Sequence, residues 1–161
     1  NEWAGGITRE VCILPAEGSS LQDRNFELRV SSAVINTTES TFSDFRGFTR
    51  LILCLEGRIT LFVEGQTVDL SNDSLFEFDG ATKVTSVNTP GAVDLNVIYK
   101  RGTRVRARVA HGEHLFTNVE RMLVFAIGSQ TTLNGTSLRQ HDAAWVSGDV
   151  RVSGHMLCVE M

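Results

Sequence analysis

Two stretches of the sequence follow one plan: Arg50–Gly65 reads RLILCLEGRITLFVEG, and Arg121–Gly135 reads RMLVFAIGSQTTLNG. Each begins with arginine, crosses an apolar run to a glycine, and continues through a short alternating segment to a second glycine. Matched positions lie 71 to 68 residues apart, namely Gly57 with Gly128, Gly65 with Gly135, Asp73 with Asp142, and Gly80 with Gly148. Because glycine marks tight turns, the phasing predicts a β-hairpin unit used twice. Two unrelated β-meanders could share part of it by chance.

Short alternating segments also dominate the rest of the 161 residues, and helical periodicity is almost absent. The expected strands are 9–14, 26–35, 49–56, 59–64, 74–78, 83–87, 93–99, 105–110, 122–127, 131–133, 143–146, 150–153 and 156–160. Regularly spaced short strands imply an all-β sandwich or barrel. We therefore expect a bicupin, two tandem small antiparallel β-barrels or jelly rolls over residues 1–110 and 111–161. The second copy is shorter and more apolar, which favours a structural role.

Charge and cysteine usage exclude several classes of partner. The formal net charge is −4, which does not favour nucleic acid, and no apolar run approaches the roughly 20 residues of a membrane helix. The opening residues, NEWAGG, lack the basic and apolar regions of a secretory signal. Three widely spaced cysteines, Cys12, Cys54 and Cys158, lie in apolar segments, as is typical of reduced, buried thiols. We expect a cytoplasmic protein without a nucleic-acid or membrane partner.

We expect no metal and no cofactor. The first repeat, residues 57–96, contains no histidine, whereas transition-metal sites of cupins use imidazole ligands. All four histidines, His111, His114, His141 and His155, lie in the second half. The sequence HGEH at His111–His114 could hold zinc if it were helical, but Gly112 and the flanking strand pattern favour a surface turn.

Polar residues share one face in three of the expected strands, because alternate residues of a strand point the same way. They are Arg29 and Ser31 in 26–35, Arg50 and Glu56 in 49–56, and Asp94 and Asn96 in 93–99. One interpretation is the solvent-facing side of an antiparallel sheet. The centre of 49–56 is apolar on both faces, however, which indicates burial on both. Charges at the ends of such a strand lie near a barrel mouth, where they must be paired or solvated.

Five sequence blocks occur in a specific order: EWAGGITREVCILP at 2–15, FELRVSSAVI at 26–35, TFSDFRGFTRLILCLEG at 41–57, FEFDG at 76–80 and VDLNVIYKRG at 93–102. In order and spacing the chain resembles the HutD/Ves family of bacterial cupin-like proteins, least closely in the second repeat. Ala4 stands where that family usually has asparagine. The resemblance implies a bicupin without the catalytic metal and with no established reaction. It also implies an association, in some bacteria, with histidine utilisation, where the protein is thought to restrain pathway flux.

These features lead to two main hypotheses. The first is a metal-independent binding protein that regulates histidine utilisation or a related pathway. Its ligand would be a small carboxylate metabolite, such as an N-formyl or N-carbamoyl amino acid. Guanidinium groups bind carboxylates through two parallel hydrogen bonds, and Asp or Asn can accept a hydrogen bond from an N–H of the ligand. The expected ligand-binding residues are Thr8, Arg9, Glu10, Arg29, Ser31, Arg50, Glu56, Asp94 and Asn96.

The second hypothesis is a metal-independent isomerase or hydrolase with Glu56 or Asp94 as general base. We expect binding rather than catalysis. A third possibility is a structural interaction protein, which gains weight if the first barrel is filled by its own side chains. A homodimer is compatible with each of them.

Overall fold

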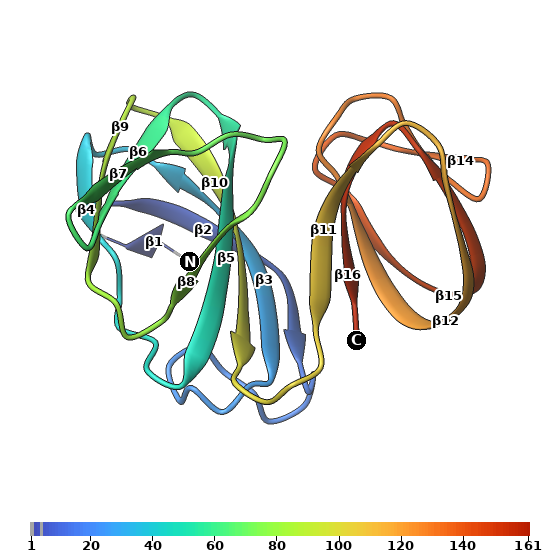
Figure 1. Cartoon of the computed structure of the whole chain (residues 1–161), viewed down its shortest axis with the longest axis horizontal. Helices are drawn as coiled ribbons and strands as arrows, with labels where there is room; N and C mark the ends of the chain where they lie inside the picture. Colours follow the sequence, from blue (N-terminus) through green and yellow to red (C-terminus); the bar gives the residue numbers. More distant parts are fainter. Residues whose placement is uncertain (1, 4) are drawn as a thin grey trace. The chain divides into compact units, whose positions relative to one another are not determined.

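The computed structural model describes residues 2, 3 and 5–161, and within this part of the chain all regular structure is β-strand (Figure 1). The expected all-β class is therefore confirmed. Among the same residues, no helix is long and apolar enough to cross a membrane. The chain divides into two compact units, Asn1–Thr103 and Arg104–Met161.

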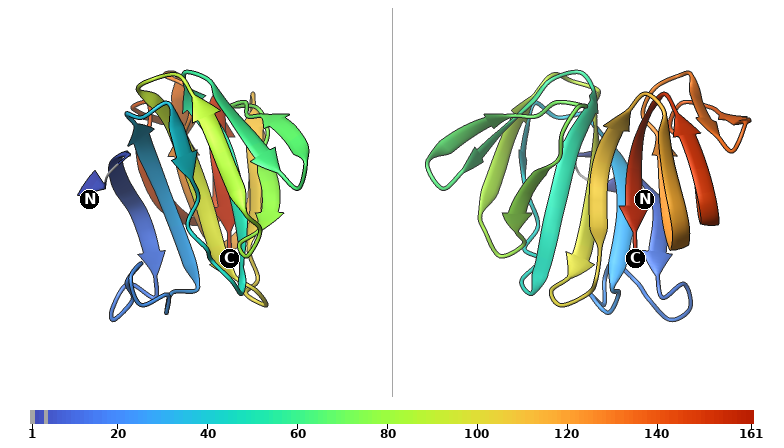
Figure 2. Two further views of the ribbon diagram at one scale, coloured as in Figure 1. Left: turned by 90° about the vertical axis from the view of Figure 1, so that its left-hand side faces the viewer. Right: turned by 45° about the vertical axis from the view of Figure 1, so that its right-hand side comes forward.

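The first unit consists of two antiparallel sheets (Figure 2). Its strands are β1 (Glu2–Trp3), β2 (Gly6–Leu14), β3 (Leu28–Ile35), β4 (Glu39–Thr41), β5 (Phe48–Glu56), β6 (Ile59–Val63), β7 (Gln66–Asp69), β8 (Phe76–Asp79), β9 (Val84–Asn88) and β10 (Ala92–Lys100). The larger sheet has the order β1-β2-β3-β10-β5-β8, and the smaller has the order β4-β9-β6-β7. Ile35 and Ile52 of the larger sheet share one buried cluster with Leu61 and Val84 of the smaller, so this core lies between the sheets.

The second unit is a single antiparallel sheet in the order β11-β16-β12-β15-β13-β14. Its strands are β11 (Arg106–His111), β12 (His114–Ala126), β13 (Thr131–Leu133), β14 (Thr136–Leu138), β15 (Ala143–Ser153) and β16 (His155–Glu160). Apolar side chains from β11, β12, β13, β15 and β16 form its core, among them Met122, Val124, Val152 and Met156. Because β11 pairs with β16 over its whole length, the units divide after Thr103, a few residues before the boundary at 110 expected from the sequence.

Strand pairing repeats between the two units as the matched glycines suggest. Ile52 of β5 pairs with Phe76 of β8, and at the matching place Leu123 of β12 pairs with Trp145 of β15. The turns Glu64-Gly65 and Asn134-Gly135 both have positive φ at each residue, 49° and 78° in the first and 49° and 83° in the second. This is the backbone of a two-residue hairpin turn. One hairpin plan is therefore used in both units.

Some elements differ from the expected strands. Segments 143–146 and 150–153 form one continuous strand, because Gly148, with φ of 83°, lies beside a register shift between β12 and β15 rather than in a turn. The short strands β1, β4, β7 and β14 were not expected. None of the three cysteines, all of which lie in the described part of the chain, forms a disulfide; Cys12 is only partly buried, whereas Cys54 and Cys158 are buried. The sequence HGEH does form a turn, around the exposed Gly112 and Glu113.

Candidate functional site

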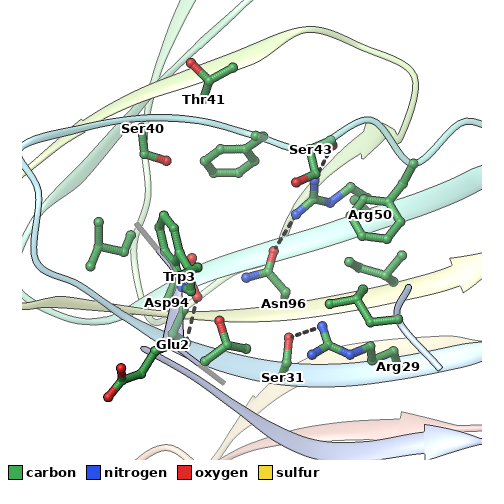
Figure 3. Close-up of a pocket in the computed structure, with 17 residues that line it drawn as sticks. Glu2, Trp3, Arg29, Ser31, Ser40, Thr41, Ser43, Arg50, Asp94 and Asn96 are labelled. Atoms are coloured by element: carbon green, nitrogen blue, oxygen red, sulfur yellow. Dashed lines mark hydrogen bonds between the residues drawn. The ribbon is translucent and has the colours of Figure 1, made fainter. Parts of the chain in front are cut away.

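A cavity of about 520 Å³ opens in the first unit, within the range of roughly 300–1,000 Å³ typical of small-molecule sites. Its wall is built from strands of the larger sheet together with the segment 40–45 (Figure 3). The lining residues are Glu2, Trp3, Thr8, Leu21, Arg29, Ser31, Ala33, Ile35, Ser40, Thr41, Phe42, Ser43, Phe45, Arg50, Asp94, Asn96 and Ile98. The first unit is thus not completely filled by its own side chains, which argues against the purely structural hypothesis.

Three neighbouring strands, β3, β10 and β5, supply most of the polar wall. Ser31 lies opposite Asn96 in the β3–β10 ladder, and Arg50 lies opposite Ile98 in the β10–β5 ladder. On the opposite face of β3, Leu28 and Val30 are completely buried. A strand buried on both faces holds its side chains in fixed directions, so these polar groups are positioned before any ligand arrives.

Arg29 is buried, and its charge is balanced by Glu10 of β2. Its Nε donates to Glu10 Oε1 at 2.9 Å, and its Nη1 donates to Ser31 Oγ at 3.1 Å. The side chain of Glu10 is 43% exposed, so this carboxylate remains partly hydrated. Arg29 therefore presents a fixed guanidinium to the cavity, with an ion-pair partner at its edge.

Arg50 is held among aromatic rings. Its guanidinium carbon lies 5.1 Å from the ring centre of Phe42, 4.9 Å from that of Phe45 and 5.2 Å from that of Phe78, distances at which cations and rings attract. Nη1 donates to Ser43 O at 3.2 Å and Nη2 donates to Asn96 Oδ1 at 3.1 Å, while the buried Nε has no hydrogen-bond partner among the described residues. Burial lowers the pKa of Arg50 to about 10, so the group stays cationic at neutral pH.

Asp94 supplies a buried carboxyl group to the same cavity. Its Oδ1 accepts a hydrogen bond from the backbone N–H of Ala33 at 3.1 Å. Burial raises its pKa to about 6, although the side chain of Asn96, the N–H of Ala33 and the charge of Arg50 act in the opposite direction. A carboxyl group in this state can accept an N–H or take up a proton near neutral pH.

The structure brings six of the nine predicted site residues to the cavity wall: Thr8, Arg29, Ser31, Arg50, Asp94 and Asn96. Glu10 adjoins them through its ion pair with Arg29. Arg9 is not in the wall, because it lies opposite Ser32 in the ladder and so shares the other face of the sheet. Among the described residues, the carboxylate partner of Arg29 is Glu10.

Glu56 also lies outside the cavity wall, because of an irregularity in the sheet. The register between β5 and β10 shifts, so that Cys54 lies opposite Asp94 but Glu56 lies opposite Val93. Leu55 is the extra residue of this bulge, and it reverses the alternation at the end of β5. Glu56 is consequently exposed, on the face that Val93 shares.

Several wall residues were not expected from the sequence. Trp3 of β1 lies at the cavity and is 42% exposed, and Phe42, Ser43 and Phe45 come from the irregular segment that follows β4. The periodicity of a strand cannot identify such residues. The closely spaced aromatics of FSDF at 42–45 were a usable signal, because buried aromatic rings beside a polar strand end are suited to covering a charge.

The family and the fold follow from comparisons with known proteins. The profile of the HutD family matches residues 1–157. The chain belongs to the HutD family. HutD from Pseudomonas fluorescens SBW25, solved in a formate condition, is 27% identical with a TM-score of 0.84, over 98% of this chain and 90% of that one. No curated protein sequence matches the chain.

Other solved structures share the fold of this HutD-family protein. A conserved protein of unknown function from Pseudomonas aeruginosa PAO1 is 28% identical with a TM-score of 0.77, over 98% of this chain and 91% of that one. A bacterial pirin from Escherichia coli in complex with nickel(II) is 9% identical with a TM-score of 0.66, over 99% and 93% of the two chains. The latter shows the fold alone, and with it the expected bicupin class is confirmed.

The cavity does not fit a transition-metal centre of the kind that many cupins hold. Among the described residues, its wall includes no histidine or cysteine, the imidazole and soft ligands that such ions prefer. Arg29 and Arg50 occupy much of the wall, and a guanidinium group has no lone pair with which to ligate a metal. The carboxylate of Glu2 points away from the other labelled side chains (Figure 3). We therefore derive no chemistry through a metal at this site.

Proposed function

We propose that this HutD-family protein binds a small carboxylate metabolite without a metal, and thereby regulates histidine utilisation or a related catabolic pathway. The observation that carries the proposal is the pair of buried arginines, 4% and 6% exposed, in the wall of one cavity. Guanidinium groups are costly to bury, and they are suited to bidentate recognition of carboxylates. A carboxylate ligand would supply Arg50 Nε with the acceptor that it lacks within the described part of the chain.

The rest of the wall favours a ligand that carries more than a carboxylate. Asp94 and Asn96 offer oxygen atoms to an N–H donor, and Ser31 and Thr8 offer hydroxyl groups. Phe42, Phe45 and Trp3 add apolar surface. An N-formyl or N-carbamoyl amino acid combines a carboxylate, an amide N–H and a carbonyl in one small molecule, and we propose this class of ligand.

Isothermal titration with N-formyl-L-glutamate tests the proposal. The diamide of the same compound is the matched control, because it has the same shape without the carboxylates. Formate, the smallest carboxylate, is a second probe, since a related HutD structure was obtained in a formate condition. We expect the acid to bind and to raise the melting temperature, and the diamide to do neither. Equal behaviour of acid and diamide would contradict carboxylate recognition.

A second candidate function is a metal-independent isomerase or hydrolase of the same ligand class. The observation that favours it is the buried Asp94, whose pKa is raised to about 6 and which therefore suits general-base catalysis near neutral pH. Glu56, the other base expected from the sequence, is not in the cavity wall. Incubation of purified protein with N-formyl-L-glutamate and detection of released formate distinguishes the two. Product in excess of the protein concentration, lost in Asp94→Asn, would establish the enzyme.

A further inference from the structure

Asp94 differs from the other acids around the cavity, because it is buried and, among the described residues, takes part in no ion pair. We propose that Asp94 takes up a proton when a carboxylate ligand enters, so that affinity of the cavity for anions rises as the pH falls through neutrality. This inference concerns the regulation of the site and rests on the proposed function. It would make the protein a receptor that responds to proton and metabolite together.

The balance of charge in the cavity is the first argument. Arg29 is neutralised by Glu10 at 2.9 Å. Arg50 and Asp94 then contribute one positive and one negative charge to the same wall, so the empty cavity is close to neutral. A carboxylate ligand adds a negative charge near the buried Asp94, which is unfavourable unless a cation enters or an acid is protonated. Protonation of Asp94 restores the balance.

Of the residues that the structure describes, those that face Asp94 offer no other acid for this role. From β5, the neighbouring side chains are Cys54, whose thiol is kept neutral because burial raises its pKa, and Arg50. From β3 and β2 come Arg29, Ser31 and Thr8, with Glu10 on the far side of Arg29. β10 contributes Asn96, β1 contributes the outward-pointing Glu2, and the segment 40–45 contributes only hydroxyl and apolar groups to the wall.

The hydrogen bonds of Asp94 are compatible with both protonation states. Oδ1 is fixed by the backbone N–H of Ala33 at 3.1 Å. A proton on the other oxygen can then be donated to a ligand oxygen, as an ionised carboxylate cannot do. Burial already raises the pKa of the empty site to about 6, and a second carboxylate nearby raises it further, because like charges disfavour ionisation.

Titration calorimetry of the full chain with N-formyl-L-glutamate, at about pH 6, 7 and 8, tests the inference. The ligand carboxylates have a pKa of about 4 and do not titrate in this range. We expect the Kd to rise with pH above about 6, approaching tenfold for each pH unit, as uptake of one proton requires. Repeating the titration in two buffers of different ionisation enthalpy should show uptake of up to about one proton per ligand.

Two variants identify the group that takes up the proton. Asp94→Asn has the shape of the protonated acid and keeps an oxygen for the Ala33 N–H. We expect it to bind with a Kd that hardly changes with pH and without proton uptake. Asp69→Asn is the matched control, because Asp69 is an exposed acid that accepts a hydrogen bond from Thr60 on the smaller sheet. It should keep the pH dependence of the wild type.

The possible results separate this inference from the proposed function. Binding by the wild type with a constant Kd and no proton uptake would overturn the inference and leave the proposed function intact. The same holds if folded Asp94→Asn retains the wild-type pH dependence, or loses binding at every pH. Absence of binding by the wild type throughout the range would overturn both.

Discussion

Asn96 connects the two charges of the cavity: its Oδ1 accepts a hydrogen bond from Arg50 Nη2 at 3.1 Å, and the same side chain favours the ionised form of Asp94. A neutral amide thus connects a buried guanidinium to a buried carboxyl group that does not form a direct ion pair with it. Both charged groups keep part of their hydrogen-bonding capacity. This arrangement is expected of a site that binds a polar ligand. In a cavity that binds nothing, buried charges with unused hydrogen-bonding capacity would only lower the free energy of unfolding.

Arg29→Met should abolish binding of N-formyl-L-glutamate with little loss of stability. Methionine keeps most of the stem packing, and the partner Glu10 is 43% exposed, so water can solvate the carboxylate that remains. We expect a decrease of about 1 kcal/mol in the free energy of unfolding, measured by urea denaturation. A loss several times larger would indicate that the Arg29–Glu10 pair is chiefly structural, and unchanged ligand affinity would remove Arg29 from the site.

Arg50→Met should be more damaging to the fold. It removes the donors to Ser43 O and Asn96 and three contacts with phenylalanine rings, and it leaves ionised Asp94 without its nearby cation. We expect a loss on the order of 2–4 kcal/mol at pH 7. The loss should shrink below about pH 6, where Asp94 becomes protonated. If denaturation curves gave the same loss of stability at pH 7 and below about pH 6, the role assigned to ionised Asp94 would be contradicted.

Asp94→Asn should make the protein more stable at neutral pH in the absence of ligand. The pKa of Asp94 is 3.8 when unfolded and about 6 when folded, so the folded state binds the proton more tightly. Below pH 3.8, Asp94 is protonated in both the folded and the unfolded state, so the substitution gives no gain in stability. As the pH rises from about 4 to about 6, the wild type loses stability relative to the variant, by on the order of 2–3 kcal/mol. Thermal melts in which the two proteins respond to pH alike would show that the folded pKa is not raised.

The thiols should react in an order set by burial. Cys12 is partly exposed, whereas Cys54 and Cys158 are buried, and burial raises the pKa of Cys158 to about 11. Since the thiolate is the reactive form, native protein should label quickly at no more than one site. Mass spectrometry after brief exposure to a thiol reagent identifies that site. Rapid labelling of Cys54 or Cys158 would contradict the assigned packing.

The sequence predicted the polar wall better than its surroundings, for a physical reason. Alternation along 26–35 and 93–99 placed Arg29 with Ser31 and Asp94 with Asn96, because the period of a strand is local and regular. The same alternation places Arg9 on the opposite face of the sheet from Thr8 and Glu10. The predicted site nevertheless included all three residues. The same rule placed Glu56 in the predicted site. Glu56 lies outside the cavity wall, because one bulged residue in β5 reverses which face of the sheet the following residue points to.

Other parts of the site depend on tertiary structure rather than on local pattern. The segment from Phe42 to Phe45 follows no period, and its position over Arg50 is fixed by backbone hydrogen bonds of Phe42 to Val84 and of Phe45 to Gly80. The carboxylate partner of Arg29 depends on which strand pairs with β3. Several of the expected strands contain an acidic residue, so the sequence alone did not identify Glu10 as that partner. The fold was more accessible, because matched glycines such as Gly65 and Gly135 specify hairpin turns by local backbone geometry.

The most direct test of the central claim is a crystal structure of the protein grown with N-formyl-L-glutamate. The account predicts difference density in the cavity of the first unit, with a ligand carboxylate within hydrogen-bonding distance of Arg29 or Arg50 and the formamide group beside Asp94 or Asn96. A ligand found only outside this cavity, at a concentration that saturates binding in solution, would contradict it.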